Sequence, residues 1–347
     1  MEDSVMLRKL FLFYFFLTAL TALFYNDYFR VTDGVYIHGL IGILGFALTG
    51  YFTVVINKRN FPSIYKELDK IYFYLSILLT LAVFIKNTVL ISIISVIFMF
   101  FSIPLLLRFN PPFIGLEKFF IKSSFIILIL DWLYFVYSLN FDHFFMMKTK
   151  LSYNYLSFSF PLSLILFSEF VKFLKLKRGE VVLSVFFLVG GVLILFFGML
   201  LQMKIVEILS AIILLGLIVY YFIKSGYIKE KYLFFNFMGL LLTGIFGLWY
   251  LLTVFKMGGD RVILLLHAHF AHYAWATYGL FLLFIKNKKL RFYTILLLMI
   301  SLLFISVYFT LNNRLFLYFS FIFFIISGII YMLYQFRGVI PWMLKRS

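Results

Sequence analysis

The sequence predicts an all-α protein, a polytopic membrane helix bundle of about twelve transmembrane helices. Of its 347 residues, 64% are hydrophobic and only 13% are charged, whereas roughly a quarter of the residues in a soluble domain are charged. The apolar residues form runs close to the roughly 20 residues that an α-helix needs to cross the hydrocarbon. No stretch is polar enough for a separate soluble domain, so residues 1–347 are expected to form a single transmembrane domain.

The expected spans follow from the positions of these apolar runs. Helices are the default, because every backbone N–H and C=O group in hydrocarbon must find a partner within its own segment. The two least distinct divisions lie at Lys86–Asn87 and at Gln202–Lys204, where only a few residues interrupt the run. The expected spans are 8–25, 35–56, 71–86, 88–107, 119–139, 156–174, 181–201, 205–223, 232–255, 262–285, 292–311 and 315–335.

The net charge of +17 is interpreted as topology and not as a nucleic-acid surface. Basic residues lie in short loops, and roughly three quarters of the 31 lysines and arginines fall in alternate loops, as the positive-inside rule requires. We therefore expect a multi-pass protein of the cell (plasma) membrane, surrounded by membrane lipid, with both termini in the cytoplasm and no nucleic-acid partner. The chain has no cysteine, which excludes disulfides, thiolate chemistry and Cys metal sites.

The five histidines all fall at or near the predicted outer face. His38 and His143 are isolated, and an isolated intramembrane histidine is often a polar residue that bonds two helices together. His267 and His269 share one span, and at about 100° per residue they point about 200° apart. They therefore cannot chelate one ion together, but each can serve a different ligand. His272 lies within about 60° of His269 on the same helix.

Two of these segments resemble a known family. Residues 267–284 read HAHFAHYAWATYGLFLLF and are similar to the tenth helix of the catalytic subunit I of haem-copper oxidases and nitric oxide reductases, which carries a His-x-His pair. Residues 38–55 read HGLIGILGFALTGYFTVV and resemble that family's second helix, and also the opening helix of NnrS-type membrane haem proteins. The family has twelve spans, both termini inside, and haem ligands on helices two and ten.

The resemblance implies roles for individual residues. His38 and His269 would be the two axial ligands of a low-spin haem b, and His267 would bind a second haem on the opposite face. His272 is an alternative to His269. Arg314, between the last two spans, and Arg261, just before the tenth, would hold haem propionates through charge-assisted hydrogen bonds; an ordinary loop charge is the competing interpretation of Arg314.

The chain departs from the family at the copper site. The family's copper ligands are histidines on helices six and seven, but residues 156–174 and 181–201 contain none. One or two haem b groups and no copper are therefore expected. The implied function is electron transfer in a respiratory chain, as a membrane cytochrome b subunit similar to those of archaeal b-type cytochrome complexes. Its partners would be other subunits, such as an extracytoplasmic cytochrome or iron–sulfur protein, and possibly quinol.

The alternative function is a polytopic transporter or lipid-linked sugar flippase without haem. Twelve helices with a basic inner face suit that class, but it usually shows internal repeats or broken helices, and the two halves show no convincing similarity. Asp131 and Glu169 lie inside spans and suggest either proton movement or structural hydrogen bonding. Gly39, Gly42, Gly45 and Gly50, which follow His38 at helical spacing, suit either a planar ring or close helix packing.

Overall fold

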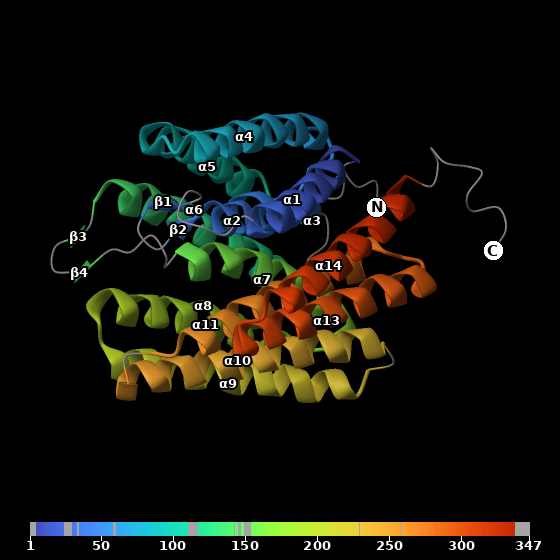
Figure 1. Cartoon of the computed structure of the whole chain (residues 1–347). Coiled ribbons are helices and arrows are strands. Elements are labelled where there is room, and N and C mark those ends of the chain that lie inside the picture. The colour runs from blue at the N-terminus through green and yellow to red at the C-terminus, as the bar shows by residue number, and fades with distance from the viewer. Residues whose placement is uncertain are drawn as a thin grey trace. The chain divides into compact units, whose positions relative to one another are not determined.

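The computed structural model is helical through almost all of its described length (Figure 1). It describes residues 5–23, 30–32, 35–57, 60–109, 117–141, 143–144, 147–148, 154–228, 230–257 and 259–336. The chain forms two compact units, Met1–Leu214 and Leu215–Ser347. Because α9 continues from one unit into the other, the division falls inside a helix.

The first unit consists of helices and two short β-ribbons. Its elements are α1 (Val5–Leu23), β1 (Arg30–Thr32), β2 (Val35–Tyr36), α2 (Ile37–Leu40), η2 (Ile41–Ala47), α3 (Leu48–Val55), α4 (Tyr65–Ile85), α5 (Thr88–Arg108), α6 (Glu117–Asn140), β3 (His143–Phe144), β4 (Met147–Lys148), α7 (Asn154–Leu174), α8 (Arg178–Leu201) and the first part of α9 (Lys204–Gly226). The strands pair as β1–β2 and β3–β4, both antiparallel.

The second unit is helical throughout its described part. It contains the rest of α9, α10 (Lys231–Met257), α11 (Arg261–His269), η4 (Phe270–Thr277), α12 (Tyr278–Phe284), α13 (Lys288–Leu311) and α14 (Arg314–Gln335). Here η2 and η4 are π-helical, and each continues its neighbouring α-helices without a break.

Ten helices among the described residues are long and apolar enough to cross a membrane. They confirm ten of the expected spans, so the chain is a polytopic helical bundle by length and composition. The other two expected spans coincide with helical stretches as well, namely α7 and the continuous run of α11, η4 and α12. This run carries three histidines, which lower its apolarity.

The two least distinct divisions between expected spans, at Lys86–Asn87 and at Gln202–Lys204, coincide with helix ends in the structure. Lys86 ends α4 in the left-handed conformation with φ 59°, and Gln202 ends α8 in the same way with φ 57°. A left-handed residue reverses the chain after a helix, so α5 and α9 begin new helices at once. The Asn87 side chain caps α5 by accepting a hydrogen bond from Leu90 N at 2.9 Å, which satisfies one of the free N–H groups at the helix start.

Hydroxyl groups join the helices of the first unit. The buried Tyr14 hydroxyl, on α1, contacts three oxygens of α4: Ser76 O at 2.8 Å, Ser76 Oγ at 2.6 Å and Thr80 Oγ1 at 2.7 Å. Tyr72 of α4 in turn meets Thr49 of α3 at 3.0 Å. Polar side chains that pair across helices hold membrane bundles together, because hydrocarbon offers them no other partner.

Serine residues and an apolar cluster join helices of the second unit. α13 and α14 lie side by side and antiparallel (Figure 1), and Ser301 Oγ donates to Ser320 O at 2.7 Å between them. Ala274 of η4 packs against Leu302 and Ile305 of α13. The histidine-bearing helix is therefore held on α13 by tight packing at the level of Ala274.

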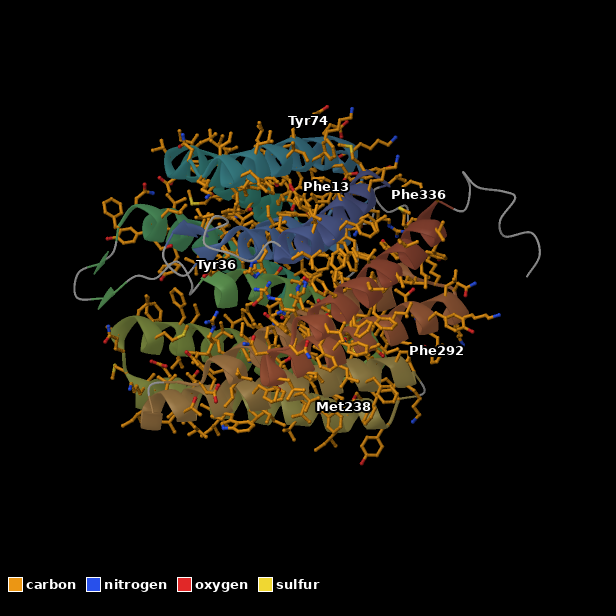
Figure 2. The ribbon with its side chains drawn as sticks, in the orientation of Figure 1. Phe13, Tyr36, Tyr74, Met238, Phe292 and Phe336 are labelled. Atoms are coloured by element: carbon orange, nitrogen blue, oxygen red, sulfur yellow. The ribbon has the colours of Figure 1, made fainter. Side chains whose placement is uncertain are left out.

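Large apolar side chains cover the outside of the helices, as a lipid environment requires. Tyr74 lies on the outward face of α4 (Figure 2) and is 64% exposed, and Leu107 of α5 is 77% exposed. In a soluble protein such exposure would mark binding or aggregation surfaces. Along helices of this length and apolarity it identifies the faces that meet lipid.

The expected orientation can be tested by cysteine labelling, since the chain has no native cysteine. Lys175 and Asn312 are matched positions, because both are exposed left-handed residues that follow a helix, with φ 50° and 51°. An odd number of expected spans separates them, so Asn312→Cys should react with a membrane-impermeant maleimide on intact cells, and Lys175→Cys only after permeabilisation. Reaction of both from one side would contradict the span count, and a reversed pattern would contradict the orientation.

Candidate functional site

Both helices that carry the predicted haem ligands contain a π-helical stretch. His38 lies in α2, three residues before η2 begins, and His267 lies in α11, three residues before η4 begins. Within the described part of the chain, π-helix occurs only in these two stretches. Long π stretches are rare in proteins, and those that occur often lie at functional sites. The backbone therefore marks the same two helices as the histidines do.

Glycine and polar residues on one face of α10 form the surface against which the histidine helix packs. Asn236, Gly239, Thr243 and Gly247 are spaced by three or four residues and so share a face. A Cβ at Gly239 would lie 2.5 Å from Ala274 Cβ and 2.6 Å from Ala274 O. Only glycine permits this approach of the two backbones.

His267 faces this surface of α10. Its Nδ1 lies 2.9 Å from Thr243 O, and a Cβ at Gly247 would lie 2.9 Å from both Nδ1 and Cε1 of the ring. Gly247 therefore leaves the space in which the imidazole lies. A carbonyl oxygen only accepts hydrogen bonds, so Nδ1 carries the proton and Nε2 keeps its lone pair.

His269 faces a different helix. Its ring meets the Phe309 ring of α13 edge-on, with the centroids 4.7 Å apart. Its Nδ1 lies 2.8 Å from Leu265 O, one turn earlier in its own helix, so in this residue too Nδ1–H donates and Nε2 keeps the lone pair. The two imidazoles thus lie against α10 and α13, in agreement with their expected separation around the helix.

His272 lies inside η4, next to Tyr273, with ring centroids 5.6 Å apart. The sequence analysis placed it within about 60° of His269 by assuming α-helical geometry. In a π-helix the hydrogen bond spans one more residue, so the rotation per residue is smaller and His272 turns further from His269 than expected. The choice between His269 and His272 as a haem ligand stays a prediction.

The remaining histidines lie in the first unit. His38 is partly buried in α2, and its ring centroid lies 6.0 Å from that of Tyr36. His143 begins the short strand β3, and its side chain lies outside the described residues. The predicted pairing of His38 with His269 joins the two units and stays a prediction.

Both predicted arginines start helices of the second unit. Arg261 follows Asp260, whose carboxylate caps α11 by accepting from Val262 N at 2.7 Å. Arg314 follows Asn313, which caps α14 by accepting from Leu315 N at 3.0 Å. Both arginines are exposed. Because α13 runs antiparallel to its neighbours, α11 and α14 begin at the same end of the unit, the end nearer to His267 and His269.

Burial changes sharply along the histidine helix. None of residues 264–273 is fully covered, whereas Ala274, Trp275 and residues 277–281 are buried. The half that carries the histidines is thus loosely covered by protein, and the other half is tightly packed.

The structure decides several interpretations that the sequence left open. The Tyr14 ring lies in the position that a Cβ of Gly45 would take, and Thr18 Cγ2 would lie 3.4 Å from one at Gly42, so these glycines accommodate α1 and not a planar ligand. Glu169 pairs with Lys172 at 3.0 Å, one turn along α7, which gives its carboxylate a local structural role. Asp131 is buried in α6.

The comparisons with known proteins identify no family for this chain. No protein-family model and no curated protein matches the chain. Among the described residues, no group of three or more His, Cys, Asp or Glu side chains is arranged to hold a metal ion. The site is therefore characterised by single imidazoles on different faces of one helix.

The close approach of α10 and η4 predicts a large effect of a small substitution. Gly239→Ala should lower the free energy of unfolding by about 1–3 kcal/mol, because the new methyl group would overlap Ala274. Gly216→Ala is the matched control, since a Cβ at Gly216 of α9 would meet nothing within 4 Å. Thermal unfolding in detergent, followed by size-exclusion chromatography, measures both. Equal melting temperatures for the two variants would contradict the tight contact.

Proposed function

We propose that this chain is a membrane haem b protein that carries electrons in a respiratory chain, with a twelve-span fold like that of haem-copper oxidase subunit I but without its copper site. The observation that carries the proposal is the pair of imidazoles on α11. Each has its Nδ1–H held by a backbone carbonyl, and they lie against different helices.

The chemistry of iron ligation explains why this observation matters. Haem iron accepts a single neutral imidazole on each face. Histidines that bind metals almost always donate their other ring N–H to a carbonyl or carboxylate, which fixes the tautomer and the ring orientation. His267 and His269 each meet this requirement through a carbonyl, Thr243 O and Leu265 O respectively.

The residues of the site take the following roles in the proposal. His269, with His38 as its predicted partner, binds a low-spin haem b, and His267 binds a second haem on the α10 side. Arg261 and Arg314 lie at the same end of the unit as the histidines, where paired hydrogen bonds from guanidinium groups suit carboxylates such as propionates. Bound haem would supply a one-electron couple, while the chain orients the imidazoles and keeps them neutral.

A partner follows from the absence of a soluble domain in the sequence. Electrons must enter and leave through other molecules, so we include in the proposal a quinol or an extracytoplasmic cytochrome or iron–sulfur subunit as the donor or acceptor. The plasma membrane, with both termini in the cytoplasm, is the location that the positions of the basic residues favour.

The test is a reduced-minus-oxidised optical spectrum of protein purified after expression with added haem, together with a pyridine extract that counts haem per chain. We expect b-type bands in the unsubstituted protein. His269→Ala and His38→Ala should remove the low-spin bands, because each deletes an axial ligand, while His143→Ala should leave the spectrum unchanged.

Other outcomes separate the alternatives. Loss of the bands in His272→Ala, with none in His269→Ala, would transfer the ligand role to His272. Retention of the full spectrum in His267→Ala would reduce the proposal to one haem. A colourless protein that is folded and inserted would contradict the haem function and favour the transporter or flippase alternative.

A further inference from the structure

The return from π-helix to α-helix leaves one backbone carbonyl of the histidine helix without a helical partner. Tyr278 N–H bonds to Trp275 O and to Tyr273 O, the second of which lies five residues back, as in a π-helix. From Tyr278 the chain is α-helical, and α-helical bonding would pair the next N–H, that of Gly279, with Trp275 O. The pattern therefore passes over the carbonyl of Ala274.

Asn236 of α10 supplies the missing donor. Its Nδ2 lies 2.8 Å from Ala274 O and 3.0 Å from Trp275 O. The side chain is fully buried, and its own Oδ1 has no hydrogen-bond partner among the described residues. Leaving a buried acceptor unpaired lowers the stability of the folded state. The Asn236 amide N–H group thus bonds to the backbone of the histidine helix, while the amide oxygen makes no hydrogen bond among the described residues.

A second contact on the same face of α10 completes the arrangement. Asn236 bonds to Ala274, and Thr243 O accepts from His267. Seven residues separate the two positions on α10, and seven separate their partners on the antiparallel histidine helix. The two contacts thus hold one register between the helices, and they lie on either side of residues 270–273, the first half of the π stretch.

We propose that Asn236 is a positioning residue for the histidine ligands: its amide fixes the place where η4 returns to α-helix, and so fixes the direction of His267 and His269. The inference rests in part on the proposed haem function, but its central claim concerns the backbone of this chain alone. Without the donor, Ala274 O would be unpaired in a region where hydrocarbon offers no substitute. Conversion of the π stretch to regular α-helix would pair every carbonyl and would rotate the preceding residues by about 100° relative to the rest of the helix.

The first test measures the backbone without any haem. In the cysteine-free chain, spin labels at Ala268→Cys and Trp249→Cys, both exposed positions of the second unit, report the rotation of α11 against α10. Asn236→Leu keeps a side chain of similar size but carries no hydrogen-bond donor, and it should shift the distance between the labels by several ångström. Asn236→Gln retains the amide donor and should restore much of the original distance.

The second test uses the haem spectrum and reduction potential. Asn236→Leu should move the low-spin spectrum or the potential, because a rotated imidazole binds iron differently. Ser327→Ala is the control, since this buried serine of α14 bonds only to Phe324 O of its own helix. If Asn236→Leu does not fold, Asn236→Ala provides a second variant without the donor.

The outcomes separate the inference from the proposed function. An unchanged label distance in both variants that lack the donor overturns the positioning role, whatever the protein binds. A shifted distance in a protein that binds no haem supports the positioning role and contradicts the haem function. A shifted distance together with a shifted potential supports both.

Discussion

Every backbone N–H and C=O group of this chain that lies in hydrocarbon needs a partner, and the rest of the structure depends on that constraint. Regular α-helices satisfy it within themselves, which is why apolar runs become helices almost throughout the described residues. A π stretch does not fully meet this requirement. Where the helix returns from i→i+5 to i→i+4 bonding, one carbonyl receives no hydrogen bond from the helix itself. In the second unit that carbonyl belongs to Ala274, and its partner comes from another helix.

The site is organised by backbone carbonyls more than by side chains. Thr243 O holds the ring of His267, Leu265 O holds that of His269, and Ala274 O is held by Asn236. Carbonyls are fixed by the helices to which they belong, so they orient a bonded group more rigidly than a flexible side chain does. This explains how two imidazoles two residues apart can keep opposite directions and the same tautomer.

The spans were predictable, since apolar length and basic loops mark them directly. Even the divisions at Lys86 and Gln202 proved to be helix ends, because the polar residues there allow a left-handed cap. The π stretches were not predictable, because the same pattern of apolar residues suits α- and π-helix. The helical spacing of the small and polar residues on α10 indicates a shared face, which is formed by Asn236, Gly239, Thr243 and Gly247. The contacts with Ala274 and His267 show that this face packs against the histidine helix.

The two π stretches are held in different ways, and the difference bears on the histidines beside them. At η2 the Tyr14 ring fills the space beside Gly45, and its hydroxyl is fixed by Ser76 and Thr80. At η4 the Asn236 amide bonds to the backbone itself. Each contact lies within a π stretch that begins three residues after a histidine. Under the proposed haem function, these contacts would hold in place the backbone that carries His38 and His267.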